Sequence, residues 1–421
     1  MSPRAASGDD RAGGAAGDGA GAGGAAEGAG DARDPGNSRD ASDGYEIVAM
    51  PNAHSHAFQR DLRGIAERPA PEAHARDDFW SWRESMFALA RALDRDSMRA
   101  VAEAVFREMR AAGYGTVGEF HYVHHRPDGT PYEDPNVLAI AVAEAAQAAG
   151  LEIVLLPAAY HRNGWDGGDR PPHGGQVRFC DPTAEAFLER VDALRAWAGG
   201  RPGVRVGVAA HSIRAVPAGW LEAIAAYADQ HRLVRHVHAS EQRRELAECE
   251  AEHGCSPIEL LHRTGFLGPQ TSVIHAIHVS PADVARIADS RTIVVTCPTT
   301  EGNLGDGYLP ALAYRDAGVR LAIGSDSQAR VDPFEELREL ETLARREQQR
   351  RGGLLAAAGD LWTHVAAAGR ASLGVEDDPR TIVIDRTHPQ IAGVPEADLP
   401  RALVASASAA VVAAPSRPPR P

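Results

Sequence analysis

The chain carries the stretch YEIVAMPNAHSH over residues 45–56, an apolar run followed by two closely spaced histidines. The run Tyr45–Met50 has the apolar and β-branched composition of a buried strand. His54 and His56 are two positions apart, and on an extended chain such side chains point to the same side. The stretch therefore predicts a strand whose end presents a pair of imidazoles.

Seven further apolar runs resemble the first, and alanine-rich amphipathic patterns separate most of them. The eight predicted strands are 45–50, 116–120, 152–157, 204–209, 233–237, 271–274, 292–296 and 319–323. The main predicted helices are 97–112, 136–149, 183–197, 217–231, 241–265 (in two pieces), 281–290, 309–317, 333–350 and 360–371. This alternation predicts an α/β protein with a (β/α)8 fold, the TIM barrel. Such barrels carry their catalytic groups at the carboxyl ends of the strands.

Composition divides the 421 residues into four parts. Residues 1–44 are rich in Gly and Ala and have almost no large apolar side chain, so we predict disorder there. Residues 45–375 make the predicted barrel, and 376–414 form a strand-rich segment in which Thr381–Asp385 is one expected strand. The Pro- and Arg-rich end, 415–421, is predicted to be a disordered tail.

Charge and cysteine content exclude several classes of protein. Lys and Arg number 44 against 58 Asp and Glu, a net charge of −14, which argues against binding to nucleic acid or to anionic membranes. No apolar run is long enough for a membrane span, and no signal peptide is visible. The four cysteines form no CxxC pair. We therefore expect a cytoplasmic protein with reduced thiols.

Four potential metal ligands lie at predicted strand ends. His54 and His56 end the first strand, His238 ends the fifth and Asp326 ends the eighth. Three imidazoles and one carboxylate suit Zn²⁺ or a similar divalent ion. With 18 histidines in the chain, structural histidines are the alternative. No lysine lies near the end of the fourth strand to bridge a second ion, so we predict one metal ion, with Zn²⁺ as the first candidate.

A bound ion of this kind lowers the pKa of its water and supplies hydroxide, so the chain is predicted to be a metal-dependent hydrolase. Glu241, three residues after His238, could move the proton of that water to a departing nitrogen. An ordinary carboxylate in the first turn of a helix is the alternative for Glu241. His275, at the end of the sixth strand, could hydrogen-bond the nucleophile or stabilise developing charge.

Two arginines at the same end of the barrel suggest an acidic substrate. Arg83 and Arg214 could each clamp a carboxylate through a bidentate contact, although a solvated surface charge is the usual role of an arginine. Gln59, Tyr122 and His211 are polar groups placed to complete such a pocket. We therefore expect a small dicarboxylate as the substrate.

Seven short motifs resemble the amidohydrolase superfamily, and within it the formimidoylglutamate deiminases of histidine degradation. They are HSHAFQR (54–60), FWSWRE (79–84), EFHYVHH (119–125), HSIR (211–214), HASEQ (238–242), CPTTEGNLGDG (297–307) and GSDS (324–327). The first and last mark the superfamily, whereas the WSWR, EFHYVHH and TTEGNLGDG strings are more selective. The resemblance runs from about residue 45 to about residue 375.

The resemblance implies hydrolysis of N-formimino-L-glutamate to N-formyl-L-glutamate and ammonia. Carried over by motif position, it implies zinc ligands, groups that assist the water, and groups that hold the glutamate part. The ligands would be His54, His56, His238 and Asp326; the assisting groups Glu241, His275 and Asp326; the binding groups Gln59, Arg83, Tyr122, His211 and Arg214.

The chain departs from the family pattern at both ends. Members of the family begin with strands that join C-terminal strands in a small β-sandwich, and here the Gly/Ala-rich stretch occupies that place. We therefore expect a truncated or partial sandwich, and leave open whether the protein is a homodimer. Two other functions stay open: a deaminase of a ring substrate such as guanine or a triazine, and a catalytically dead barrel kept as a binding protein.

Overall fold

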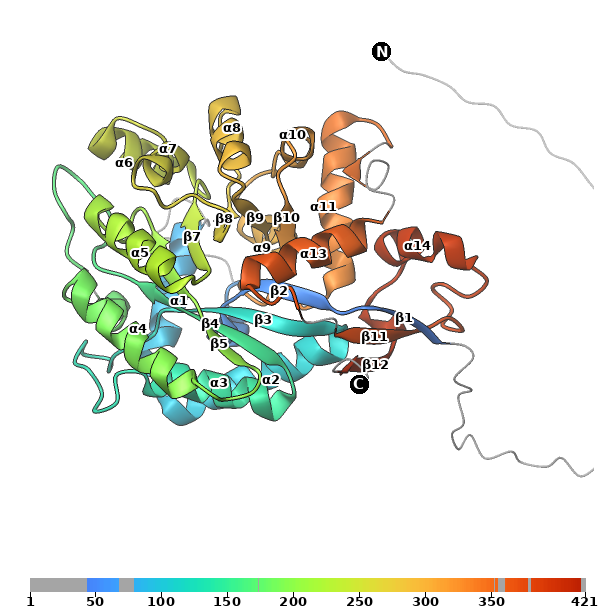
Figure 1. Ribbon diagram of the computed structural model, residues 1–421, viewed down its shortest axis with the longest axis horizontal. Coiled ribbons are helices and arrows are strands. Elements are labelled where there is room, and N and C mark those ends of the chain that lie inside the picture. The colour runs from blue at the N-terminus through green and yellow to red at the C-terminus, as the bar shows by residue number, and fades with distance from the viewer. Residues whose placement is uncertain are drawn as a thin grey trace, which may run out of the picture. The chain divides into compact units, whose positions relative to one another are not determined.

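Parallel strands form a barrel in the computed structural model, and helices cover its outer side (Figure 1). The structure describes residues 44–67, 79–172, 174–351, 353–354, 360–377 and 380–417. Residues 1–43 and 418–421, for which the composition predicts disorder, lie outside the described residues. The fold class is the (β/α)8 barrel that the sequence predicts.

The strands pair in chain order around the barrel. They are β2 (Met50–Ser55), β3 (Tyr114–His121), β4 (Glu152–Ala159), β5 (Val204–Val206), β6 (Val208–Ser212), β7 (Arg235–Ala239), β8 (Thr271–His275), β9 (Ile293–Thr296) and β10 (Leu321–Ile323). β5 and β6 both pair with β4 and together make the fourth strand of the barrel. Seven of the eight predicted barrel strands therefore lie where the apolar runs place them.

The prediction for the first strand is wrong. The run 45–50 divides: Gly44–Val48 forms β1, which pairs with a strand from the end of the chain, and the barrel strand β2 begins only at Met50. β1 is only partly buried, whereas every residue of β2 is buried. An apolar run fits either kind of sheet, so composition could not separate the two.

The barrel closes between β10 and β2. The backbone amides of Ser325 and Asp326 each donate to the carbonyl of His54 at 3.1 Å. A Cβ at position 324 would lie 2.6 Å from the carbonyl oxygen of His54, so glycine is required where the two backbones approach. Closure thereby brings Asp326 beside the two histidines of β2.

Helices follow most strands. They are α1 (Phe79–Ala92), α2 (Arg95–Ala112), α3 (Val137–Ala149), α4 (Ala184–Ala198), α5 (Ala218–His231), α6 (Arg243–His253), α7 (Pro257–Arg263), α8 (Pro281–Asp289), α9 (Pro298–Leu304), α10 (Ala311–Asp316), α11 (Pro333–Gln348), α13 (Leu361–Leu373) and α14 (Leu399–Ser406). The nine predicted helical segments are present, and the longest of them, 241–265, forms two helices, α6 and α7, as expected. The predictions missed α1, α9 and α14, of which α1 and α9 contribute side chains to the pocket described below.

A small antiparallel sheet lies beside the barrel (Figure 1). Its strand order is β1, β11 (Thr381–Asp385) and β12 (Val412–Arg417). The strand expected at 381–385 is confirmed, and Ile382 and Ile384 are buried in it. β12 extends to residue 417, so the prediction of a disordered tail from Pro415 is wrong for 415–417. The partial sandwich is thus a three-stranded sheet that also takes its first strand from the start of the barrel segment.

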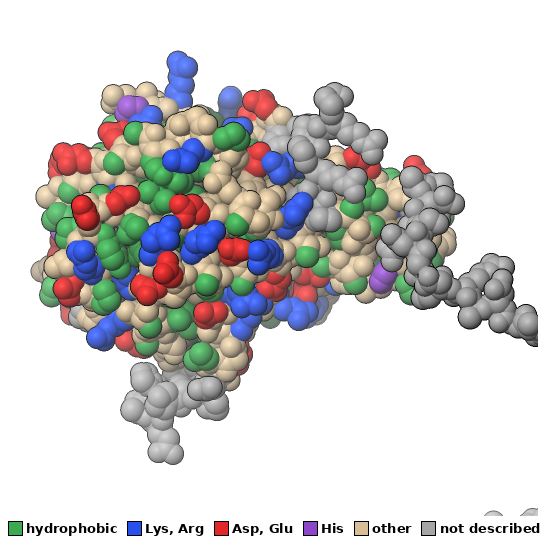
Figure 2. All heavy atoms as spheres, turned by 90° about the horizontal axis from the view of Figure 1, so that it is seen from below, with side chains coloured by type: hydrophobic (Ala, Val, Ile, Leu, Met, Phe, Trp, Pro, Cys, Tyr) green, Lys and Arg blue, Asp and Glu red, His purple; other side chains and the backbone are tan. Residues whose placement is uncertain are grey.

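Three further observations concern the surface, the described helices and the cysteines. Acidic, basic and apolar side chains are interspersed over the face drawn in Figure 2. None of the described helices is both long enough and apolar enough to cross a membrane. All four cysteines, which lie in the described part of the chain, are free thiols.

Candidate active site

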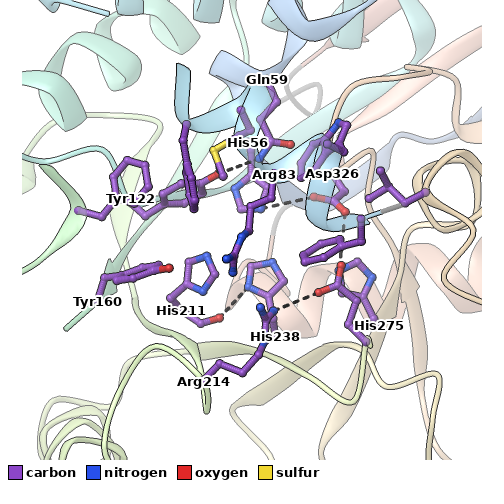
Figure 3. Close-up of a pocket in the computed structure, with 17 residues that line it drawn as sticks. His56, Gln59, Arg83, Tyr122, Tyr160, His211, Arg214, His238, His275 and Asp326 are labelled. Atoms are coloured by element: carbon purple, nitrogen blue, oxygen red, sulfur yellow. Dashed lines mark hydrogen bonds and ion pairs between the residues drawn. The ribbon is translucent and has the colours of Figure 1, made fainter. Parts of the chain in front are cut away.

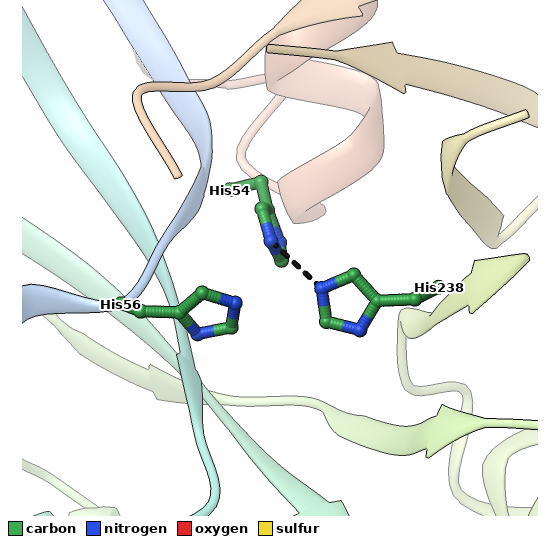
Figure 4. A group of neighbouring side chains, drawn as sticks. All are labelled: His54, His56 and His238. Carbon is green, nitrogen blue, oxygen red and sulfur yellow. Dashed lines mark hydrogen bonds between the residues drawn. The ribbon is translucent and has the colours of Figure 1, made fainter. Parts of the chain in front are cut away.

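Three buried imidazoles meet at the carboxyl end of the barrel strands (Figure 4). His54 and His56 come from β2 and His238 from β7. Their ring nitrogens lie within 4.8 Å of one another, and the Nε2 atoms of His54 and His238 are 3.1 Å apart. None of the three residues is more than 5% exposed. The fold therefore brings His238 to a pair of histidines that precede it in the sequence by more than 180 residues.

Asp326 completes this group. Its Oδ1 atom lies 3.4 Å from Nε2 of His54 and 3.4 Å from Nε2 of His56. A tetrahedral zinc ion with Zn–N bonds of about 2.0–2.1 Å separates its ligand atoms by about 3.4 Å. The distances from Asp326 to His54 and His56, and the 3.1 Å between His54 and His238, are thus close to what a single ion of this size requires.

Hydrogen bonds to backbone carbonyls orient two of the rings. Nδ1 of His56 lies 2.8 Å from the carbonyl oxygen of Phe120, and Nδ1 of His238 lies 2.7 Å from that of His211. Each Nδ1 must therefore carry the proton, which leaves a lone pair on Nε2. Burial lowers the pKa of both rings, so they are neutral.

This arrangement supplies a test of whether a cation fits. The bare Nε2 of His56 faces the Asp326 carboxylate, an acceptor against an acceptor, and the two repel unless a cation lies between them. Imidazole nitrogen and carboxylate oxygen are the donors that Zn²⁺ accepts. The residues present therefore fit a divalent metal ion.

His275 lies on the other side of Asp326. Its Nε2 is 3.7 Å from Oδ2 of Asp326 and 3.7 Å from Oε1 of Glu241, and its Nδ1 is 3.2 Å from Oε1 of Glu301. Burial alone would lower the pKa of His275, but these three carboxylates outweigh it and raise the pKa to about 10. These carboxylates favour the protonated form of His275, whose ring lies between Asp326 and Glu241.

Glu241 precedes α6 and its side chain faces the pocket (Figure 3 shows the surrounding residues). Its Oε2 accepts from Nη2 of Arg214 at 3.4 Å, and the residue is 4% exposed. Burial raises its pKa, although His275 and Arg214 oppose the shift. A buried carboxylate aimed into a pocket is not an ordinary solvated carboxylate of a first helical turn, so the geometry favours the proton-transfer role.

Three residues of this region hold a strained backbone conformation. Ser240, His275 and Asp326 have φ angles of 56°, 69° and 45°, in the left-handed region that non-glycine residues rarely adopt. Each lies where a strand ends and the chain turns into its loop. Such strain persists only where the surrounding structure enforces it, and it concentrates at functional sites.

A family pattern decides the class of protein. The pattern of the amidohydrolase family matches residues 47–361, which is most of the chain. The chain belongs to the amidohydrolase family. It is 39% identical over 311 residues to formimidoylglutamate deiminase of Pseudomonas aeruginosa, covering 74% of this chain and 67% of that protein.

Two further similarities agree with this assignment. The chain is 28% identical over 305 residues to 5-methylthioadenosine/S-adenosylhomocysteine deaminase of Haloarcula marismortui, covering 71% of this chain and 62% of that protein. The crystal structure of an amidohydrolase from Brucella melitensis superposes with a TM-score of 0.80 at 31% identity, covering 89% of this chain and 86% of the other. The protein is an amidohydrolase of the deaminase type, a hydrolase that acts on a carbon–nitrogen bond.

The other half of the amidohydrolase pocket carries the groups expected to hold substrate. Gln59, on the short helix η2 (Ala57–Leu62), donates from Nε2 to the hydroxyl of Tyr122 at 2.8 Å. Arg83 comes from α1, and Arg214 from the loop after β6. The His211 ring also lines the pocket, while its carbonyl orients His238.

All predicted site residues except His54 line this pocket, and His54 lies beneath its floor among the ligands. The residues that line it are His56, Gln59, Phe79, Trp82, Arg83, Met86, Phe87, Tyr122, Tyr160, Phe179, His211, Arg214, His238, Glu241, His275, Leu304 and Asp326 (Figure 3).

Several of these residues escape the sequence analysis. Tyr160 directly follows β4, so the rule that strand ends carry the site could have found it. Phe79, Trp82 and Met86 lie at helical spacing on one side of α1, and this periodicity could have predicted the helix from the sequence. Two carboxylates behind the pocket also received no role: Glu301, which lies in the TTEGNLGDG string and contacts His275, and Glu245, which contacts Arg214 and which no local pattern distinguishes from a surface carboxylate.

Proposed function

We propose that this amidohydrolase hydrolyses the formimino group of N-formimino-L-glutamate, giving N-formyl-L-glutamate and ammonia, with one Zn²⁺ ion. The observation that carries the proposal is the presence of Arg83 and Arg214 in the same pocket as the His238 and Asp326 side chains. The 39% identity to a formimidoylglutamate deiminase supports it. The expected partner is thus a small dicarboxylate, with neither nucleic acid nor membrane involved.

The metal ion is assigned to His54, His56, His238 and Asp326. When bound there, a divalent ion lowers the pKa of a water molecule toward neutrality and so makes it a nucleophile. With a divalent ion bound, the three neutral rings and the one carboxylate would give the site a net charge of +1. This positive charge favours the removal of a proton from that water. Asp326, as a ligand of that ion, would also be able to accept the proton of the water.

Proton transfer is assigned to Glu241. It would take one proton from the attacking water as the C–O bond forms and give it to the amidine nitrogen; the hydroxyl proton of the adduct would follow to the same nitrogen as the C–N bond breaks and the formyl carbonyl forms. Its raised pKa suits a group that both accepts and donates near neutral pH. His275, 3.7 Å from Glu241 and favoured in its protonated form, would stabilise the Glu241 carboxylate between the two transfers and the charge that develops on the oxygen of the adduct.

Arg83 and Arg214 are assigned to the two carboxylates of the substrate. Guanidinium groups bind carboxylates through paired N–H donors. Gln59 keeps an unbonded Oε1 among the described residues, and with the Tyr122 hydroxyl it offers polar contacts to the same part of the substrate. His211, beside Arg214, completes the polar wall.

A deaminase of a ring substrate is the second candidate. The relative from Haloarcula marismortui bears the name of a nucleoside deaminase, and Phe79, Trp82 and Phe179 give this pocket aromatic walls. Two guanidinium groups have little use with a neutral ring, which favours the dicarboxylate. A dead barrel is disfavoured because the three histidines lie together, with Asp326 3.4 Å from two of them, and because Glu241 faces the same pocket.

The test is ammonia release by the purified, zinc-loaded protein. N-formimino-L-glutamate, guanine and 5-methylthioadenosine are compared, each with and without a chelator. We expect ammonia only from N-formimino-L-glutamate, and its loss when the metal is removed. Turnover of either ring compound without turnover of N-formimino-L-glutamate would overturn the proposal.

A further inference from the structure

The indole of Trp80 lies among three guanidinium groups. The Cζ atoms of Arg244, Arg83 and Arg214 are 4.3, 4.7 and 5.7 Å from the centre of its ring. Contacts shorter than about 6 Å are in the range of cation–π attraction. The same four residues line a hollow that adjoins the pocket and shares Arg83 and Arg214 with it.

These guanidinium groups come from separate parts of the fold. Arg83 lies one helical turn after Trp80 on α1, Arg214 follows β6, and Arg244 is on α6. Trp80 is itself fixed by the ring of Phe79, 5.2 Å away in an edge-to-face arrangement. The indole therefore contacts guanidinium groups of its own helix, of the loop after β6 and of α6.

The three cations are unequally compensated. Arg244 pairs with Glu248 at 2.8 Å, and Arg214 lies 3.4 Å from Glu241. For Arg83, the described part of the chain offers only the amide oxygen of Asn163 at 3.4 Å and no carboxylate within ion-pair distance. Burial lowers the pKa of Arg83, and repulsion from Arg214 and Arg244 adds to this.

Like charges held this close in a partly buried site would move apart without a compensating group. The negative face of an indole attracts each cation without neutralising it and without occupying the hydrogen-bond donors. Within the residues that the structure describes, Arg83 and Arg214 each have one long side-chain hydrogen bond, to Asn163 and Glu241 at 3.4 Å, so carboxylate groups of a bound ligand would find further N–H donors on both guanidinium groups.

We propose that Trp80 is a positioning residue of the carboxylate clamp: its indole holds Arg83 and Arg214 together so that a dicarboxylate ligand can bind. The inference deepens the proposed function and rests on it for the identity of the substrate. Trp80 does not line the pocket itself, so it acts through the arginines. Its loss should weaken substrate binding and leave the chemical step unchanged.

The test compares Trp80→Leu, Trp80→Phe and the wild type with N-formimino-L-glutamate. We expect Trp80→Leu to raise KM about tenfold or more with kcat within about twofold, because several cation–π contacts are lost. Trp80→Phe should fall between the two, since a benzene ring attracts cations less strongly than an indole. An unchanged KM in Trp80→Leu, or a lower kcat at constant KM, would overturn the inference.

Trp197→Leu is the matched control. Trp197, near the end of α4, also has a guanidinium against its ring, that of Arg201 at 4.5 Å, but lies at the opposite end of the barrel. Both constants should stay at their wild-type values in this variant. If Trp80→Leu does not fold, as judged by its melting curve and zinc content, Trp80→Phe carries the test, and a KM equal to that of the wild type overturns the inference.

Binding of N-formyl-L-glutamate, measured by calorimetry, separates the inference from the proposed function. We expect Kd to rise about tenfold in Trp80→Leu and to stay constant in Trp197→Leu. If the wild type releases no ammonia but its Kd rises in Trp80→Leu as expected, only the proposed function is overturned. If the wild type is active but KM and Kd are the same in Trp80→Leu, only the inference about Trp80 is overturned.

Discussion

The two halves of the pocket are held in place in different ways. In the metal half, His56 and His238 extend from strands of the barrel, and backbone carbonyls fix their outer nitrogens at 2.8 and 2.7 Å. In the clamp half, Arg83 and Arg214 extend from a helix and a loop, and aromatic rings and side-chain ion pairs hold them.

This difference separates chemistry from recognition. Hydrogen-bonded strands keep atoms in place closely enough for metal binding, and a substitution there should remove the activity altogether. Contacts between side chains are adjustable, so substitutions in the clamp half should change affinity by degrees. The following predictions test this contrast, beginning with the largest effect.

Removing a strand-held ligand should abolish the activity. We expect His238→Ala to lose zinc and to release ammonia at the background rate, because the remaining ligands leave the ion incompletely coordinated. Metal content by mass spectrometry and an ammonia assay measure this. His253→Ala, at the end of α6 and outside the pocket, is the control and should keep both. Full zinc content with normal turnover in His238→Ala would remove this residue from the ligand set.

Removing the proton carrier should lower the rate but keep the metal. We expect Glu241→Gln to lower kcat roughly 10²–10⁴-fold with zinc content unchanged. Glu245→Gln should reduce kcat far less, because the Glu245 carboxylate lies 3.8 Å from Arg214 and does not line the pocket. Equal losses in the two variants would show that the acidic cluster, and not Glu241 alone, carries the effect.

The two arginines of the clamp should behave differently from each other. Arg83→Met should raise KM for N-formimino-L-glutamate by about 10–100-fold at unchanged kcat, since one charged hydrogen-bonding group is lost. Arg214→Met should raise KM and also lower kcat, because Glu241 loses a partner 3.4 Å away. Arg195→Met on α4 is the control for both. Identical changes of kcat in the two variants would contradict this distinction.

The free energy of unfolding of the protein should depend on pH through the buried carboxylate of Asp181. This buried carboxylate pairs with Arg190 at 2.7 Å and lies 3.7 Å from the ring of His125. Burial by itself raises the pKa of Asp181, but Arg190 and His125 outweigh it and hold the pKa below the ordinary 3.8. The group therefore adds stability above the ordinary pKa, and this is lost as the pH falls through the lowered value.

Asp181→Asn should accordingly cost about 3–5 kcal/mol at neutral pH, because it leaves Arg190 buried without a carboxylate. The difference in Tm between variant and wild type should narrow as the pH falls below about 4. Melting curves from neutral to acidic pH measure this, and activity at neutral pH should change little. A constant difference over the whole range would remove Asp181 as its source.

Local pattern was sufficient for the metal half. His54, His56, His238 and Asp326 each follow an apolar run, and in a parallel barrel the ends of such runs meet. The period of two along a strand puts the histidines of β2 on one side, so their meeting could be predicted before any coordinates. The structure adds the distances of 3.4 Å from Asp326 to His54 and His56, which are suited to a single ion and which no sequence pattern contains.

The clamp half could be predicted only as candidates. Arg83 and Arg214 were recognisable by charge, but their common neighbour Trp80 and the carboxylates behind them were not. Helix and loop positions have no fixed period relative to a barrel axis, so packing alone decides which of their side chains reach the pocket.

The sequence by itself determined the barrel and the candidate metal ligands, because strand periodicity and apolar runs act over a few residues. Only the tertiary structure decided that 44–48 leaves the barrel for the small sheet and that an indole joins the arginines. Both depend on contacts between distant segments, Ile47 with Ile382 and Trp80 with Arg244, whose energies no local stretch contains.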